Sequence, residues 1–168
     1  MMRSTTRPEI RRGSVAVEAA VVLPILLIMM LGIWEVGRII QVQQILVNSA
    51  REGARMAAGG YVNGTPVTET MVEQAVRDYL QAAGLPTPAV TGADIELICL
   101  VSPGWTDPSD ALPLDKFQVK VTIPAGAPFE SLRWSFVTKI TSKSDMQAVV
   151  DWVSLNNEAI VVDTQLPL

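Results

Sequence analysis

The hydrophobic positions of this chain follow three patterns along its length. From Ala19 to Trp34 there are 16 residues without a charge, and apolar residues occupy every side of a helix drawn through them. From residue 35 to residue 58, apolar and small residues recur every three or four positions, as one face of a helix requires. Beyond residue 60, short amphipathic and alternating segments predict a small mixed domain.

The apolar segment has the length of a membrane span. Residues Val15 to Trp34 would form a helix of roughly 30 Å, which matches a bilayer core. A cleaved secretory signal has a shorter apolar run and ends in a small-x-small site, which Gly37-Arg38-Ile39-Ile40 does not provide. A core helix would be amphipathic. We therefore expect one transmembrane helix over residues 14–37, kinked at Pro24.

Charge predicts the orientation of this helix. The first 13 residues hold four arginines against Glu9, a net charge of +3, whereas the whole chain carries −4. A basic flank keeps the N-terminus in the cytoplasm, so we expect residues 1–13 to form a cytoplasmic leader and the rest to be exported. The acidic remainder argues against nucleic-acid binding, which requires clustered cations.

Residue types exclude several kinds of chemistry. The chain has no histidine and one cysteine, Cys99, which rules out histidine catalysis, an internal disulfide and a multi-cysteine zinc site. The aspartates Asp107, Asp110 and Asp115 do not have EF-hand spacing, so we expect a solvated loop. We expect no catalytic residue, no metal, no cofactor and no small-molecule substrate, and Cys99 as a small buried side chain on a strand.

Glu18 stands at the start of the apolar segment. A carboxylate inside a bilayer costs a few kcal/mol and is a functional candidate for that reason. A carboxylate near a helix N-terminus is also favoured by the helix dipole at the membrane interface. Position alone leaves both interpretations open.

The residues around Glu18 carry a family resemblance. A basic leader ends at Gly13, and Glu18 is the fifth residue after it, as in the processing site of type IV prepilins and pseudopilins. Those proteins usually have a large apolar residue after the cut, where this chain has Ser14. The run from Gly13 to Pro24 resembles the TadE-like family of the tight-adherence (Flp) pilus system more closely. Further family positions are matched by Gly32, Glu35 and Arg38, and by Ala50, Arg51, Glu52, Gly53, Ala54 and Arg55.

This resemblance implies a function in pilus assembly. A prepilin peptidase would cut between Gly13 and Ser14, and Glu18 would pair with the N-terminal amine of a neighbouring subunit. The implied partners are that peptidase, other pilin or pseudopilin subunits, the assembly platform and the lipid bilayer. The protein would sit in the bacterial inner membrane and could enter a pilus. The alternative is an unprocessed, signal-anchored binding module of the cell envelope.

The remaining segments predict an α+β fold. We expect the first helix to extend over residues 38–60 and to end at Gly59-Gly60. Its small-residue face would pack on its own domain or on other subunits. In the exported domain, residues 61–168, we expect a turn through Asn63 to Pro66, a helix over 69–83 with Thr68 as N-cap, and a helix-covered antiparallel sheet of three strands. The predicted strands are 93–101, 117–123 and 134–143, while 145–162 reads equally as a strand or a short helix.

Overall fold

The structure is a computed structural model that describes residues 11–101, 104–126, 128, 132 and 145–156. The chain divides into two compact units, Met1–Ile39 and Ile40–Leu168.

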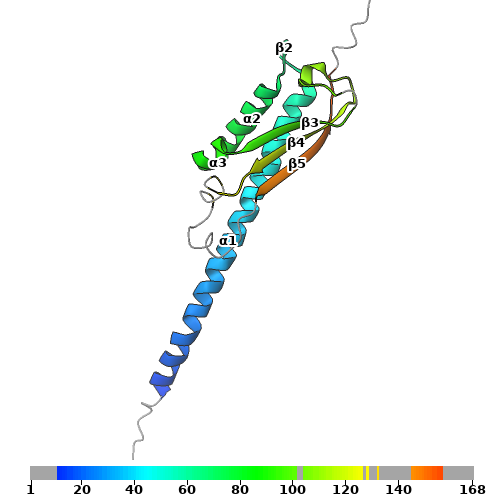
Figure 1. The fold of residues 1–168 in the computed structure, drawn as a ribbon. Helices are drawn as coiled ribbons and strands as arrows, with labels where there is room; N and C mark the ends of the chain where they lie inside the picture. The colour runs from blue at the N-terminus through cyan, green and yellow to red at the C-terminus, as the bar shows by residue number, and fades with distance from the viewer. Residues whose placement is uncertain (1–10, 102–103, 127, 129–131, 133–144, 157–168) are drawn as a thin grey trace, which may run out of the picture. The chain divides into compact units, whose positions relative to one another are not determined.

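Helix α1 runs from Arg11 to Gly59 (Figure 1). Its residues 11–39 are the described part of the first unit, and its later residues belong to the second. Val, Leu, Ile and Ala dominate its first half, and Pro24 is the proline within it. The helix ends at Gly59, and Gly60 follows with φ +66°, a backbone conformation that glycine adopts without strain. The predicted end of the first helix at Gly59-Gly60 is confirmed.

The second unit combines the last part of α1 with short helices and strands, which confirms the predicted α+β class. The hairpin strands come first, followed by two helices and then by the three strands of the main sheet, with one 3₁₀ turn in the loop before β4. In chain order they are β1 (Tyr61–Val62), β2 (Thr65–Pro66), α2 (Glu69–Ala82), α3 (Thr87–Thr91), β3 (Asp94–Cys99), η1 (Pro108–Asp110), β4 (Lys116–Ile123) and β5 (Met146–Val153).

A tight hairpin connects α1 to α2. Strands β1 and β2 pair antiparallel, and the two residues between them, Asn63 and Gly64, have φ angles of 52° and 77°. Two consecutive positive φ angles are typical of the two-residue hairpin turn that Asn-Gly favours. The turn predicted here is confirmed.

The main sheet has the strand order β3-β4-β5, and both pairings are antiparallel. Strand β4 lies in the centre and alternates strictly between buried and half-buried residues after Lys116. Its buried residues share one face with Ile95 of β3 and Ala148 of β5, which lie opposite Val121 in register. The buried residues of β4 are Phe117, Val119, Val121 and Ile123.

Two of the three predicted strands are present as β3 and β4. The third strand of the sheet is β5, which comes from the segment that the sequence left open between strand and helix. The strand predicted over 134–143 lies wholly outside the described residues. The short helix α3, between Pro86 and Gly92, was not predicted.

The core forms where α1, α2 and β4 meet. A Cβ atom added at Gly53 of α1 would lie 2.6 Å from Cγ2 of Val76, 3.4 Å from Cγ1 of Val72 and 3.5 Å from Cγ1 of Val119. Gly53 therefore marks the point where α1 approaches both α2 and the sheet. The neighbouring small residues Ala50 and Ala54 are fully buried. The small-residue face of α1 thus packs on its own unit.

The segment after β5 is hydrogen-bonded both to the loop before β4 and to the end of α1. Asn156 is 6% exposed, and its side-chain amide donates to the carbonyls of Ser109 and Ala111 at 2.9 and 3.1 Å. The preceding residue, Leu155, donates its backbone N–H to the carbonyl of Ala58, near the end of α1, at 2.8 Å. These bonds satisfy backbone groups that would otherwise be buried without partners.

The N-terminus of α2 is capped differently from the prediction. Thr68 occupies the N-cap position, but its hydroxyl bonds to the hydroxyl of Thr70 and makes no cap hydrogen bond. The carboxylate of Asp107 accepts from the N–H of Glu69 at 3.0 Å instead. A carboxylate from a distant loop fills the role because it satisfies a free N–H and complements the helix dipole.

We predict that Gly53→Ala destabilises the second unit by about 1–2 kcal/mol, because the clash with a stiff valine outweighs the gain in helix propensity. Thermal unfolding of the detergent-solubilised chain, followed by tryptophan fluorescence, measures the change. Gly59→Ala is the matched control, since no atom lies within 4 Å of a Cβ added there, and its unfolding temperature should stay close to wild type. Equal unfolding temperatures for both variants would contradict the packing at Gly53.

Candidate functional site

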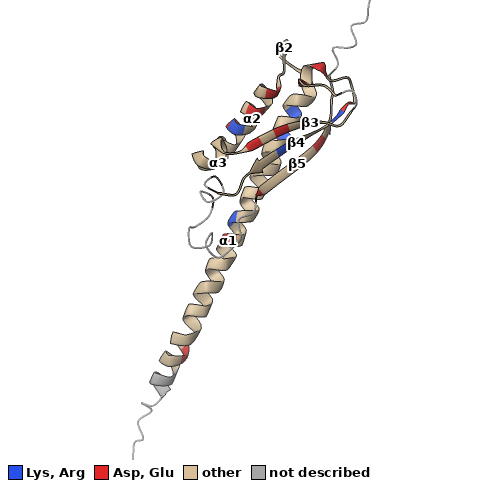
Figure 2. Ribbon diagram, in the orientation of Figure 1, with Lys and Arg blue, Asp and Glu red and all other residues tan. Residues whose placement is uncertain are grey.

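The N-terminal part of α1 is an apolar surface without cover. Every residue from Val15 to Trp34 is exposed, and Figure 2 shows how sparse charge is along this stretch. By length and composition, it is the one helix among the described residues able to cross a membrane. A soluble protein seldom exposes a contiguous apolar surface of more than a few hundred Å². This segment needs an apolar environment.

Gly13 and Ser14 lie in the first turn of α1. The first four N–H groups of a helix have no partner within the helix, so opening this turn breaks few hydrogen bonds. Unwinding residues 11–14 into an extended backbone therefore costs little. The absence of a side chain at Gly13 removes one obstacle to close approach.

Glu18 is exposed on α1, and Pro24 lies farther along the same helix. Because proline has no N–H, Pro24 cannot donate to the carbonyl of Ala20, so the helix carries an unused acceptor in its apolar part. In lipid such a group requires local compensation. The structure thus places a carboxylate and a weakened helical turn on the same apolar surface.

Glu35 and Arg38 follow the apolar stretch at a spacing of three residues. Glu35 is 8% exposed, and it is the buried residue between Val15 and Arg38. Arg38 is exposed, and both side chains take part in interactions. A buried carboxylate is costly unless it is paired or hydrogen-bonded. Glu35 is therefore covered by other residues of the chain and is not part of the exposed apolar surface.

The segment from Ala50 to Arg55 combines two roles on two sides of α1. Gly53 forms the close contact with α2 and β4 described above, on the buried side. On the other side, Glu52 accepts two hydrogen bonds from the guanidinium of Arg55, at 3.0 and 2.6 Å. These bonds hold the pKa of Glu52 below its ordinary value of 4.5 and raise the pKa of Arg55. Arg51 is exposed and lies outside this pair.

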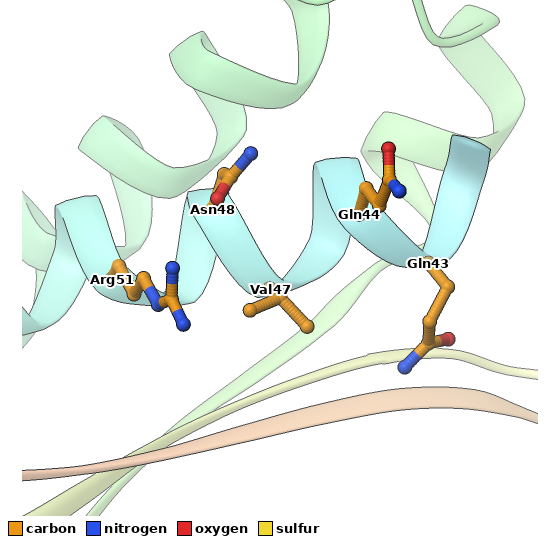
Figure 3. Close-up of a pocket in the computed structure, with 5 residues that line it drawn as sticks. All are labelled: Gln43, Gln44, Val47, Asn48 and Arg51. Atoms are coloured by element: carbon orange, nitrogen blue, oxygen red, sulfur yellow. The ribbon is translucent and has the colours of Figure 1, made fainter. Parts of the chain in front are cut away.

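A shallow groove runs along α1 over about two turns, lined by exposed and half-buried side chains. We call it the α1 groove, and it has a volume of about 400 Å³. Figure 3 shows its five lining side chains on one helix, and one of them, Gln43, donates to the backbone carbonyl of Gln147 in β5 at 2.9 Å. The lining residues are Gln43, Gln44, Val47, Asn48 and Arg51. Only Arg51 was singled out from the sequence, although polar residues at helical spacing could have indicated the others.

The aspartates of the loop before β4 have structural tasks. Asp107 caps α2, and Asp115 accepts from the N–H of Leu112 at 2.9 Å, so the expectation of a simply solvated loop is incomplete. Within the described part of the chain, no three His, Cys, Asp or Glu residues are placed to hold a metal ion. Cys99 ends β3 and is half-buried, which is less burial than we expected.

One comparison with known proteins gives a match. Residues 13–55 match the family described as TadE-like protein, so a TadE-like family domain occupies this part of the chain. No curated protein and no solved structure matches the chain. The matched segment contains Gly13, Glu18, Pro24, the α1 groove and the Glu52–Arg55 pair, whereas α2 and the sheet lie beyond it.

We predict that Glu52→Gln lowers the unfolding temperature slightly at pH 7 and has no effect at low pH. A carboxyl group whose pKa is lowered on folding stabilises the folded state above its unfolded pKa and loses that contribution as the pH falls. The gap between wild type and variant should therefore close below pH 4.5. High salt should also narrow it, because the pair is largely exposed. A gap that is constant from pH 7 to pH 3 would contradict this role of the pair.

Proposed function

We propose that this chain is a TadE-like pseudopilin, a membrane-anchored minor component in the assembly of a type IV pilus of the Flp, or tight-adherence, kind or of a related secretion apparatus. The observation that supports the proposal is that a family match and an exposed apolar helix occur in the same segment. The TadE-like domain at residues 13–55 contains the helical segment whose apolar residues are exposed on all sides. An exposed apolar surface of this length is rare in a soluble protein.

The membrane segment and its flanks support an orientation. Residues 14–37 would span the inner membrane once, with the arginine-rich leader 1–13 in the cytoplasm. The helix extension 38–60 and the α+β domain 61–168 would then lie outside the cytoplasm. From there the protein could be incorporated into a pilus. The lipid bilayer is the first partner in this arrangement.

Processing and subunit pairing form the second part of the proposal. A prepilin peptidase would cut between Gly13 and Ser14 and release the leader, so the new amine would lie four residues before Glu18. A carboxylate and an ammonium in an apolar environment are each costly alone and much less costly as a pair. Glu18 of one subunit would therefore pair with the amine of another and set the register between the two helices.

The other partners would be proteins of the assembly machinery, namely further pilin or pseudopilin subunits and the assembly platform. Proteins of the TadE-like kind are typically not enzymes. The chain has no histidine with which to perform acid–base chemistry. We therefore propose a structural function without a catalytic site, a cofactor or a nucleic-acid partner.

The first prediction concerns the mature N-terminus. In cells with an active prepilin peptidase, mass spectrometry should find that the chain begins at Ser14, and Gly13→Ala should leave most of the leader attached. Gly37→Ala is the matched control, since a Cβ there meets no atom within 4 Å, and it should be processed normally. An intact leader in the wild type would contradict the proposal and favour an unprocessed, signal-anchored binding module.

The second prediction separates processing from assembly. Glu18→Ala and Glu18→Gln should both be cut at Gly13 but should form far fewer pili, because both remove the charge that pairs with the amine. Electron microscopy of surface filaments, with the mature mass measured on the same cells, tests this. Wild-type numbers of pili in Glu18→Gln would show that the carboxylate charge has no such role.

A further inference from the structure

The α1 groove is a feature that anchoring, processing and the pairing of Glu18 leave unused. Three of its five residues, Gln44, Asn48 and Arg51, are exposed, whereas Gln43 and Val47 are half-buried and point toward the strands in Figure 3. Its volume of about 400 Å³ falls at the lower end of the range of small binding sites and is enough for a few side chains of another protein. Every lining residue belongs to the TadE-like domain, whereas the elements that bury the other face of α1 lie beyond it.

Arg51 gives the groove its charge. Among the described residues, its guanidinium has no hydrogen-bond or ion-pair partner, in contrast to Arg55, which pairs with Glu52, and Arg77, which lies 3.8 Å from Glu73. A guanidinium presents five N–H donors in a planar fork that fits a carboxylate. An exposed arginine of this kind in a groove is prepared for an anionic group.

The rest of the groove is neutral and polar. The side-chain amides of Gln44 and Asn48 can each donate and accept hydrogen bonds, as a peptide backbone requires of a partner. Val47 adds one apolar contact, and none of the described residues that line the groove is a carboxylate that would neutralise Arg51. This lining suits an extended segment with an acidic side chain.

A second copy of the chain has the complementary charge. Residues 40–168 hold eight Lys and Arg against 14 Asp and Glu, a net charge of −6. Copies with this charge repel each other unless a cationic region of one meets an acidic region of the other. Exposed carboxylates are available on the described surface, among them Asp94, Asp110 and Asp151.

We infer that the α1 groove docks a carboxylate-bearing segment of a second copy of this chain, with Arg51 as the charged anchor. The inference rests on the proposed function, which places several copies in one membrane. The groove and the acidic segment are different surfaces, so the contact is heterologous and can repeat from copy to copy.

The test is self-association of the full chain in detergent micelles, measured by sedimentation equilibrium. Arg51→Glu should weaken self-association about tenfold at low ionic strength, and Arg51→Gln should weaken it less. Arg55→Glu is the matched control, because it makes the same change in net charge one turn farther along the helix, outside the groove. It should stay close to wild type, and high salt should reduce the effect of Arg51→Glu. Circular dichroism verifies that each variant is folded.

Three results would overturn the inference. A monomeric wild type at all concentrations excludes a second copy as the occupant. An equal loss in Arg51→Glu and Arg55→Glu shows that net charge alone matters. Unchanged self-association in Arg51→Glu together with lost pili in cells assigns the groove to a different subunit. Each leaves the proposed function standing as long as the wild-type leader is removed, which the mature mass measures separately.

Discussion

One continuous helix has to satisfy two environments, and the rest of the structure depends on this constraint. Apart from its ends and the acceptor left unused by Pro24, the backbone of α1 satisfies its own hydrogen bonds within 49 residues, so the helix can exist both in lipid and in a protein core. The side chains then decide which surroundings each part needs. From Val15 to Trp34 they are apolar on all sides, and from Val42 onward they divide into a buried and an exposed face. The change of pattern suits the first part to an apolar environment, as a candidate membrane span, and the other part to the core of the second unit.

The second unit is built around the buried face of α1. Gly53 allows α2 and β4 to approach the helix at the same point, and the alternation along β4 supplies an apolar face for that contact. Polar groups hold the ends in place: Asp107 caps α2, and Asn156 joins the segment after β5 to the loop before β4. Packing therefore explains Gly53 of the family-matched segment, whereas it does not explain the exposed Arg51 of the same segment. Arg51 therefore makes the α1 groove a candidate surface for binding another subunit.

Local patterns made most of the elements predictable. The continuous apolar run, the spacing of three and four residues, Gly59-Gly60 and Asn63-Gly64 each specify a structure through nearby residues alone, and all of those elements are present. The strict alternation over 117–123 likewise predicted β4. Contacts between distant residues could not be predicted in this way. Nothing near Glu69 shows that Asp107, 38 residues later, caps α2, and nothing near Gly53 shows that Val76 and Val119 will enclose it. The candidate residues Gly13 and Glu18 came from the family resemblance, and their roles are a matter for experiment.

The most direct test of this account is a scan of spin-labelled single-cysteine variants along α1, from residue 15 to residue 58, in the full chain reconstituted into lipid bilayers. Accessibility to oxygen, which concentrates in lipid, should be high throughout residues 15–34 without a helical period. From residue 40 onward, accessibility to a water-soluble relaxation agent should rise and fall every 3.6 residues, with maxima at positions such as Gln44, Asn48 and Arg51. Water accessibility throughout residues 15–34, or no periodicity after residue 40, would contradict the assignment of one helix to two environments.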